Sequence, residues 1–270
     1  MANTVKKTKK VTKAQEEKLA KGTERRARKA KIVIERLKKE YPDADCTLDY
    51  DDAWKLLVSV RLAAQCTDER VNKVVGGLYE KYPSIEALAD APADDIEDIV
   101  RPCGLGHSKA RDISKCMKML RDDFGGRVPD NMKDLLKLPG VGRKSANLVM
   151  GDVFGKPAIV TDTHCIRLTN RIGLVENEKT PAKVEKELWK IIPPEEGNSF
   201  CHRLVYHGRE VCTARTLPYC ERCCLSDICD SRDEFMREKE EKAKEKEKKA
   251  VKKEFEEKLG KPCGKDCFVV

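Results

Sequence analysis

A lysine and an aspartate in the middle of the chain have the types and spacing of a nucleophile with an acidic partner. Lys144 follows a glycine-rich turn, and Asp162 comes eighteen residues later, before a predicted helix at 163–172. A lysine at a helix start, partly removed from water, can lose its proton and attack carbon. Attack on a sugar C1′ would expel a base and leave a Schiff base, while the aspartate stabilises the developing positive charge. A solvated lysine and a helix-capping aspartate are the alternatives.

Four cysteines form a second group with chemical potential. They lie within eighteen residues, at gaps of seven, two and five, and are Cys212, Cys220, Cys223 and Cys229. The chain has 13 cysteines and no visible export signal, which favours metal ligation over disulfides. Structural zinc sites commonly combine two closely spaced pairs, and only one such pair is present. The compact loop therefore favours a [4Fe–4S] cluster, with zinc or unligated cysteines as alternatives.

Three further features surround these cysteines. Cys224, adjacent to Cys223, is expected to be a spare thiol. Arg215 lies inside the loop, where a guanidinium could contact phosphate. The C-terminal pair Cys263 and Cys267 resembles a metal half-site only superficially, and we expect it to be an unpaired tail.

The segment LPGVGRKSA at 138–146 joins two predicted helices and has the pattern of a helix-hairpin-helix motif. We expect Asp130 to cap the first of these helices. Two glycines around a valine permit a tight turn and leave backbone N–H groups open at a helix N-terminus, where anions bind. Such a turn holds a phosphate without identifying bases. The hairpin residues that we predict to serve DNA binding are Leu138, Gly140, Val141, Gly142 and Arg143.

The elements that position these groups are predicted to be helices. Short amphipathic segments follow one another with Gly, Pro, Asp and Ser between them, at 23–41, 52–64, 67–82, 84–91, 93–101, 108–124 and 131–137. We find no alternating strand of sheet-forming length, and aromatic residues make up only 5% of the chain. The fold class is therefore all-α.

Charge is unevenly distributed along the 270 residues. The net charge is +8, yet residues 1–40 alone contain 15 Lys and Arg against 5 Asp and Glu. The basic excess thus belongs to an N-terminal arm, and the body must bind any nucleic acid through a patterned face. No apolar run approaches the ~18 residues of a membrane span. These features argue against membrane proteins and secreted disulfide scaffolds.

The motifs together resemble the endonuclease III family of DNA glycosylases. They occur in family order, over about 27–230, as LAAQCTDERVN at 62–72, GLGHSKA at 104–110, LPGVGRKSAN at 138–147, VTDTH at 160–164, HGRE at 207–210 and the cysteine loop. The resemblance implies two helical domains with DNA in the cleft between them. One is a six-helix barrel at 46–156 with the hairpin at 131–152, and the other is an iron–sulfur domain built from 23–45 and 157–232. A flexible basic arm at 1–22 and a charged Lys/Glu tail at 233–270 complete the expected organisation.

The resemblance also implies roles for individual residues. Lys144 corresponds to the family's nucleophile and Asp162 to its catalytic aspartate, with His164 following as in the family. Gln65 resembles the residue that fills the gap left by a flipped base, and Leu105 occupies the position of a wedge. Unstacking a base costs a few kcal/mol that these contacts would offset.

The sequence departs from the family pattern in two places, the cysteine loop and the loop that carries Leu105. The first cysteine gap has seven residues where the family usually has six, a change that costs little in loop closure. Gly106 and His107 replace a bulkier polar pair beside the wedge, and we count His107 among the DNA contacts.

The sequence therefore predicts a bifunctional DNA glycosylase/AP lyase that removes oxidised pyrimidines and cleaves the strand by β-elimination. Its partner would be double-stranded DNA containing damaged bases or abasic sites, and we expect a monomer without membrane association. A monofunctional mismatch glycosylase and a non-catalytic DNA-binding module are the alternatives. Missing targeting signals predict a cytoplasmic, nucleoid-associated protein, although the basic arm could equally direct it to a nucleus.

Overall fold

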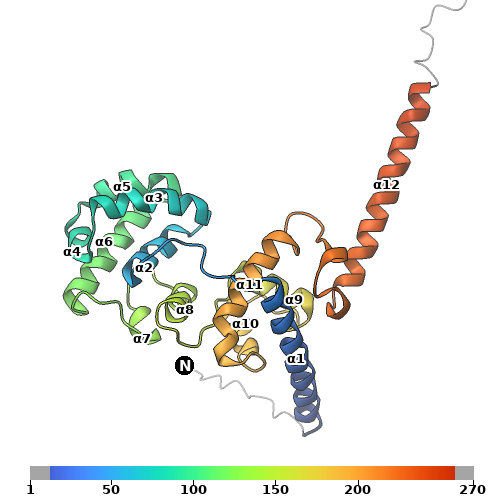
Figure 1. Ribbon diagram of the computed structural model, residues 1–270, viewed down its shortest axis with the longest axis horizontal. Helices are drawn as coiled ribbons and strands as arrows, with labels where there is room; N and C mark the ends of the chain where they lie inside the picture. Colours follow the sequence, from blue (N-terminus) through green and yellow to red (C-terminus); the bar gives the residue numbers. More distant parts are fainter. Residues whose placement is uncertain (1–12, 259–270) are drawn as a thin grey trace, which may run out of the picture.

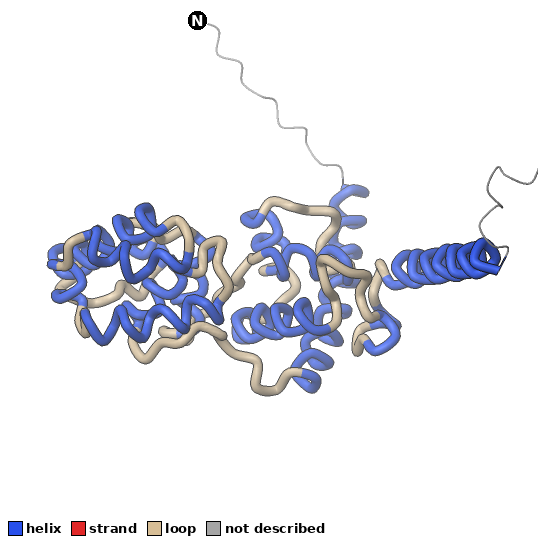
Figure 2. The backbone as a smooth tube through the Cα atoms, turned by 90° about the horizontal axis from the view of Figure 1, so that it is seen from above, coloured by secondary structure: helices blue, strands red, loops and turns tan. Residues whose placement is uncertain are grey.

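The computed structural model describes residues 13–258, and every regular element within them is helical (Figures 1 and 2). This confirms the all-α prediction. The α-helices are α1 (Lys13–Glu40), α2 (Ala53–Leu62), α3 (Asp68–Lys81), α4 (Ile85–Asp90), α5 (Ala93–Val100), α6 (Gly106–Asp123), α7 (Met132–Leu135), α8 (Arg143–Asp152), α9 (Thr163–Ile172), α10 (Pro181–Leu188), α11 (Gly197–Glu210) and α12 (Arg232–Lys258).

Side-chain caps explain where several helices begin. Asp52 caps α2, Ser84 caps α4 and Asp162 caps α9, each accepting a hydrogen bond from a backbone N–H of the first turn. The cap of α7 differs from our prediction, because Asn131 accepts the N–H of Asp134. Asp130, the residue we expected there, instead forms an ion pair with Lys156.

Helices α2 to α8 enclose one hydrophobic core. Its buried residues come from every helix between Ala53 and Asp152, and they include Leu62, Leu78, Ile96, Met117 and Val149. Helix α6 is the longest of this group and packs against both α4 and α5. This body carries the hairpin between α7 and α8 (Figure 1).

A second core joins the two ends of the sequence. Helix α1 contributes Val33 and Leu37, and residues from α9 to α11 pack around them, among them Leu168 and Phe200. Contacts between α1 and α11 bring segments together that lie more than 150 residues apart in the sequence. The cysteine loop sits on this body, since Cys212, Cys223 and Cys224 pack against its core.

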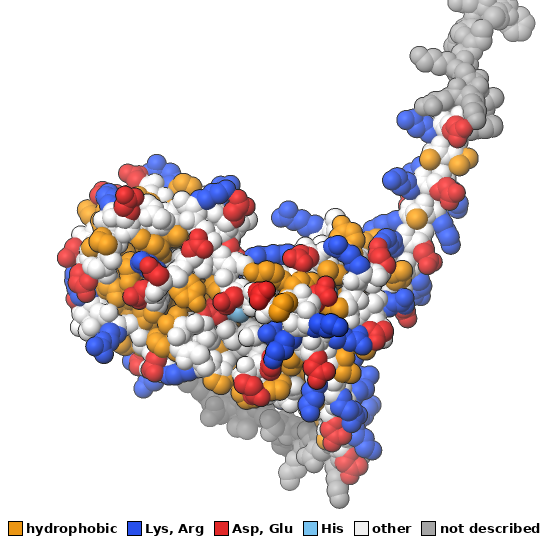
Figure 3. Space-filling model, viewed as in Figure 1, with side chains coloured by type: hydrophobic (Ala, Val, Ile, Leu, Met, Phe, Trp, Pro, Cys, Tyr) orange, Lys and Arg blue, Asp and Glu red, His pale blue; other side chains and the backbone are white. Residues whose placement is uncertain are grey.

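The N-terminal helix begins earlier than we predicted, whereas the charged C-terminal tail is helical as its sequence indicates. Helix α1 begins at Lys13, so residues 13–22 of the predicted flexible arm are helical. In the first turn of helix α12, the ring of Phe235 packs under the guanidinium of Arg171, and the helix then projects from the body (Figures 1 and 2). Basic and acidic side chains alternate along this projecting helix (Figure 3). Cys263 and Cys267 lie outside the described residues.

Candidate active site and cysteine cluster

A cavity of about 350 Å³ lies between the two cores and contains the predicted catalytic pair. Its wall includes Lys144 from α8, Asp162 and His164 from the start of α9, and residues from the segment that connects α1 to α2. Two groups that are eighteen residues apart in the sequence therefore face one space. A cavity of this size and mixed polarity is typical of a small-molecule or flipped-base pocket.

Lys144 lies in the first turn of α8, directly after the hairpin. Gly140 has φ +76° and Gly142 is the N-cap of α8, for which no side chain supplies a capping hydrogen bond. The N–H groups of this turn are therefore open to an anion. Lys144 itself is exposed, and its amine makes no hydrogen bond or ion pair with any residue that the structure describes. An amine in this state is available to a substrate.

A glycine is required at position 140 because the hairpin packs closely against the side chain of Arg61. A Cβ at this position would lie 2.9 Å from the Cδ of Arg61, and the positive φ disfavours other residues. Arg61 is held in turn by Asp112, with 2.7 Å between its Nη2 and the carboxylate. Val141 packs against the first core as expected of the residue that anchors the turn.

Asp162 performs the capping role and also lines the cavity. Its Oδ1 accepts the backbone N–H of Cys165 at 2.7 Å, which fixes the start of α9. Its carboxylate faces the cavity that Lys144 lines. The two interpretations considered for this residue are compatible, because one oxygen can cap the helix while the other faces a reacting group.

His164 is held against α11 by a close approach that only glycine permits. A Cβ on Gly208 would lie 2.3 Å from its Nδ1, which gives a reason for the glycine in the HGRE segment. Arg167 lies 3.3 Å from the same Nδ1. Burial lowers the pKa of His164, and the opposing charge of Asp162 only partly offsets this effect. The ring is therefore neutral at pH 7.

Gln65 and Leu105 are exposed residues in the left-handed region of backbone conformation. Their φ angles are +58° and +52°, and Leu105 is 55% exposed. Such a conformation costs about 1–2 kcal/mol for a residue with a Cβ. Strain together with exposure of an apolar side chain is the pattern of functional loops. His107, also exposed, lies 3.1 Å from Glu97 through its Nδ1.

The remaining predicted DNA contacts differ in their exposure and in their partners. Leu138 is 2% exposed and belongs to the first core, so its side chain faces inward. Arg143 forms a two-bond ion pair with Glu185 of α10, at 2.6 and 2.8 Å. Arg215 is exposed on the cysteine loop.

The four cysteines of the loop face one common space. Cys212, Cys220, Cys223 and Cys229 line a small cavity, and Cys224 is not part of its wall. Arg171 donates to the Sγ of Cys212 at 3.3 Å, and the Nε2 of His207 lies 3.4 Å from the Sγ of Cys223. Burial raises the pKa of Cys223 to about 12. Four thiols that converge on one cavity are an arrangement that a bound cation would hold as thiolates.

The spacing of the sulfur atoms argues against a single zinc ion. A tetrahedral ion with Zn–S bonds of 2.3 Å brings every pair of sulfurs to about 3.8 Å. Within the described part of the chain, no three of these sulfurs lie within 4.8 Å of one another. As the loop stands, its sulfurs are thus farther apart than the four ligands of one tetrahedral ion.

The cavity also contains residues that the sequence did not single out. Asp45 and His202 line its wall, and Asp68 does so while paired with Arg209 at 2.8 Å. Asp68 and Arg209 belong to the quoted segments at 62–72 and 207–210, whereas Asp45 and His202 lie in none of the quoted motifs. Only the tertiary fold brings these separate segments together.

Comparison with known proteins identifies relatives over most of the chain. Residues 58–194 match the HhH-GPD superfamily of base excision DNA repair proteins. Endonuclease III of Synechocystis is 44% identical over 196 residues, covering 72% of this chain and 89% of the relative.

Two solved structures are similar in fold. A trapped endonuclease III–DNA covalent intermediate, in an estranged-adenine complex, matches with a TM-score of 0.74 and 40% identity over 78% of this chain and 98% of that one. A non-covalent endonuclease III–DNA complex matches with a TM-score of 0.72 and 38% identity over 84% of this chain and 100% of that one.

None of the described helices has the length and the apolar character needed to cross a membrane.

Proposed function

We propose, since this chain belongs to the endonuclease III family of HhH-GPD base excision DNA repair proteins, that the cavity between its two cores is the active site of the family's reaction. The protein is a base excision repair DNA glycosylase with AP lyase activity. The observation that carries the site assignment is the unpaired amine of Lys144 in the wall that also contains Asp162.

Lys144 is the nucleophile in this account. After it gives up a proton, its amine forms a bond to C1′ of the damaged nucleotide as the bond between C1′ and the base breaks, and the base leaves with a proton. Opening of the sugar ring then gives a Schiff base at the Lys144 nitrogen. Loss of a C2′ proton expels the 3′ phosphate by β-elimination. Asp162 stabilises the positive charge on the sugar and assists proton transfer from the amine.

The DNA contacts follow from exposure and open backbone groups. The N–H groups at Gly142 and the start of α8 hold a phosphate of the damaged strand. Gln65 and Leu105 enter the duplex where the damaged nucleotide leaves it, which explains why two exposed residues retain a strained conformation. The substrate would be duplex DNA with oxidised pyrimidines or abasic sites, bound by one copy of the protein.

The cysteine loop fits a [4Fe–4S] cluster better than a zinc ion. Cys212, Cys220, Cys223 and Cys229 would hold it, because all four line one cavity and no three of their sulfurs are as close as the ligands of one zinc ion. The bound cluster would supply four iron–thiolate bonds that cross-link the loop. On this basis the body around the second core is the iron–sulfur domain, and the body around the first core is the barrel domain. We place the protein with the DNA of the cytoplasmic nucleoid.

A duplex containing one thymine glycol tests the proposed function. Base release and strand cleavage are measured separately, beside duplexes with an abasic site and with undamaged thymine. We expect release and cleavage on the first, cleavage on the second and neither on the third. Cleavage of the abasic duplex without release from thymine glycol would contradict the assigned substrate, and inactivity on all three would contradict the site.

The visible absorption spectrum tests the cysteine cluster. Purified protein should show the broad visible absorption of an iron–thiolate cluster, and a colourless zinc-loaded protein would refute that assignment.

A further inference from the structure

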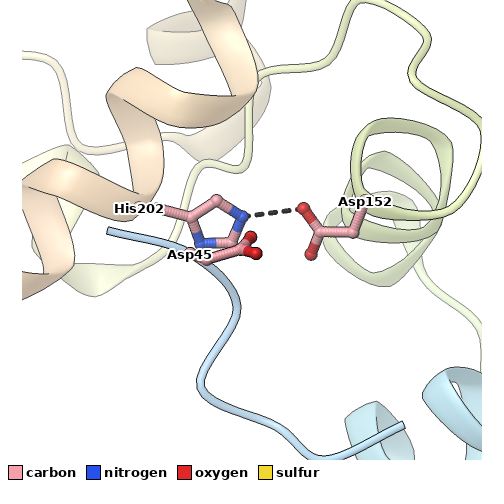
Figure 4. A group of neighbouring side chains, drawn as sticks. All are labelled: Asp45, Asp152 and His202. Carbon is pink, nitrogen blue, oxygen red and sulfur yellow. Dashed lines mark hydrogen bonds and ion pairs between the residues drawn. The ribbon is translucent and has the colours of Figure 1, made fainter. Parts of the chain in front are cut away.

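Three ligand-type side chains meet at one place (Figure 4), and two of them, Asp45 and His202, also line the active-site cavity. Asp45, Asp152 and His202 each offer an atom, and these atoms all lie within 4.8 Å of one another. They come from the segment between α1 and α2, the last residue of α8 and the middle of α11. This group has no part in the mechanism described above.

The hydrogen bonds of Asp152 are unevenly shared between its two oxygens. Oδ1 lies 2.7 Å from Nε2 of His202 and accepts a hydrogen bond from Asn198 at 2.6 Å. Oδ2 is buried and accepts no hydrogen bond from a nitrogen or oxygen of the described structure, and the thiol of Cys46 is the donor that lies near this carboxylate. The side chain as a whole is only 1% exposed. A buried carboxylate oxygen without a partner is unfavourable unless a positive charge comes to it.

The charges of the surrounding groups also favour a positive charge at this place. Asp45 and Asp152 are two carboxylates at close range, and within the described residues neither pairs with a lysine or arginine. Two like charges at this distance repel each other unless a positive charge, either a metal ion or a protonated His202, lies between them. Asp152 also ends α8, where the carbonyl groups of the last turn add partial negative charge. The place is thus prepared for a cation and not for an anion.

We propose that Asp45, Asp152 and His202 form a site for one divalent metal ion of the zinc class, separate from the cysteine cluster. Two carboxylates and an imidazole are a ligand set that zinc accepts, with bonds of about 2.0–2.2 Å. The imidazole distinguishes the site from one for magnesium, which prefers oxygen ligands and retains its waters. The bound ion satisfies Oδ2 of Asp152 and replaces the direct contact between His202 and Asp152.

Such an ion connects the two bodies of the protein. Asp152 ends α8, the helix whose first turn carries Lys144. His202 belongs to α11, which contributes to the second core, and Asp45 lies in the segment before α2. The ion would therefore fix a part of the cavity wall that Asp45 and His202 form. Its binding is a property of these three residues and does not depend on catalysis.

Zinc content and thermal stability of the complete protein, with its cysteine cluster intact, test the proposal. The proteins compared are the wild type, Asp45→Asn, Asp152→Asn, His202→Gln and the control Asp43→Asn, which changes an exposed aspartate on the same segment. Asp45→Asn is the decisive variant, because Asp45 is exposed and its only hydrogen bond, from the N–H of Cys46, can also be made by asparagine. It should therefore fold even if the Asp152 variant does not.

After equilibration with buffered Zn²⁺ and gel filtration, the wild type and Asp43→Asn should retain one zinc equivalent more than the three site variants. The affinity of the site variants for Zn²⁺ should be about tenfold to hundredfold lower or worse. At a hundredfold excess of Zn²⁺ over Kd, the wild type should melt about 5 °C higher than without zinc, and Asp45→Asn should show no such shift. Equal zinc retention by the wild type and Asp45→Asn would overturn the site. Equally strong binding of Mg²⁺ would overturn its assignment to the zinc class.

Discussion

The first turns of α6 and α8 each follow a glycine turn and each carry a lysine, but the two lysines have opposite environments. Lys109 of α6 is completely buried, and its amine donates to the carbonyls of Leu62 and Cys103, both at 2.8 Å. Lys144 of α8 is exposed, makes no interaction with the described residues and lines the cavity. Burial lowers the pKa of Lys109, yet its amine is fully occupied. An open nitrogen beside a cavity is therefore a better mark of a nucleophile than burial is.

Lys109 has a structural task that serves the same surface. Its two acceptors lie three residues before Gln65 and two before Leu105, so one buried amine ties together the loops that carry both strained residues. The strain at these positions costs about 1–2 kcal/mol each, which such buried hydrogen bonds offset. Lys109 thus stabilises the loops that carry Gln65 and Leu105, whereas the amine of Lys144 remains available for reaction.

The largest effect is expected from Lys144→Gln. Strand cleavage should fall by at least about 10³-fold, as it does when other enzymes lose a nucleophile. Stability should change by less than about 0.5 kcal/mol, since the side chain is exposed. Initial rates of nicking and a urea denaturation curve measure the two quantities. Lys118→Gln, at an exposed position of α6, is the matched control. Full nicking by Lys144→Gln would refute the contrast between the two lysines.

Asp162→Asn should lose base release while keeping the fold. Loss of a group that assists proton transfer and stabilises charge typically costs about 10²–10⁴-fold. Asparagine caps a helix about as well as aspartate does, so the free energy of unfolding should barely change, whereas Asp162→Ala should lose about 1 kcal/mol. Single-turnover base release and urea denaturation separate these effects. If Asp162→Asn retains its rate, Asp162 is a cap and nothing more.

Lys109→Met should show the opposite pattern to Lys144→Gln. The variant leaves two buried carbonyls without a donor, each at a cost of about 1–3 kcal/mol. We expect a loss of roughly 2–4 kcal/mol in the free energy of unfolding, seen as a lower urea midpoint by circular dichroism. A stability equal to that of the wild type would show that Lys109 does not support the two loops.

Leu105→Gly should raise stability slightly and lower activity. Glycine adopts a positive φ without penalty, and the exposed leucine loses no core contact, so a gain of about 0.5–1 kcal/mol is expected. Glycosylase activity on duplex DNA should decrease because the wedge is missing. Unchanged activity on duplex substrates would remove Leu105 from the DNA interface.

The smallest effect concerns the pH dependence of stability through His164. Burial lowers its pKa in the folded protein, so the unfolded chain, with an ordinary value of about 6.5, binds the proton more readily. The contribution of this residue is therefore present above pH 6.5 and is lost as the pH falls through the folded value. His164→Gln should make unfolding less sensitive to pH below 6.5. Proton NMR of the ring checks the direction, and a pKa above 6.5 would contradict it.

Local patterns predicted the parts of the molecule that depend on local physics. The helix at 163–172 and its Asp162 cap, and the glycine turn before Lys144, follow from neighbouring residues. Helices α10 and α11 were not singled out, and the cap of α7 was assigned to Asp130 when the adjacent Asn131 supplies it. Neighbouring residues of equal capping ability cannot be separated by type alone.

Long-range contacts could not be predicted from the sequence, because they depend on how the helices pack together. The contact of Asp152 with His202 spans 50 residues, and no spacing rule links them. Arg143 was expected to contact DNA, and its ion pair with Glu185 depends on how α8 meets α10. The environment of Lys109 likewise depends on where the loops before α3 and α6 meet. The sequence shows which lysines follow glycine turns, but only the fold shows which amine is open.

Borohydride trapping followed by peptide mapping tests the central claim most directly. The wild-type protein is incubated with thymine glycol and abasic duplexes under borohydride, and the covalent adduct is digested and located by mass spectrometry. We predict adducts on both duplexes, with the added mass on Lys144 and none on Lys109, and no adduct with Lys144→Gln. An adduct on any other amine, or no adduct on either duplex, would contradict the assignment of Lys144 as the nucleophile.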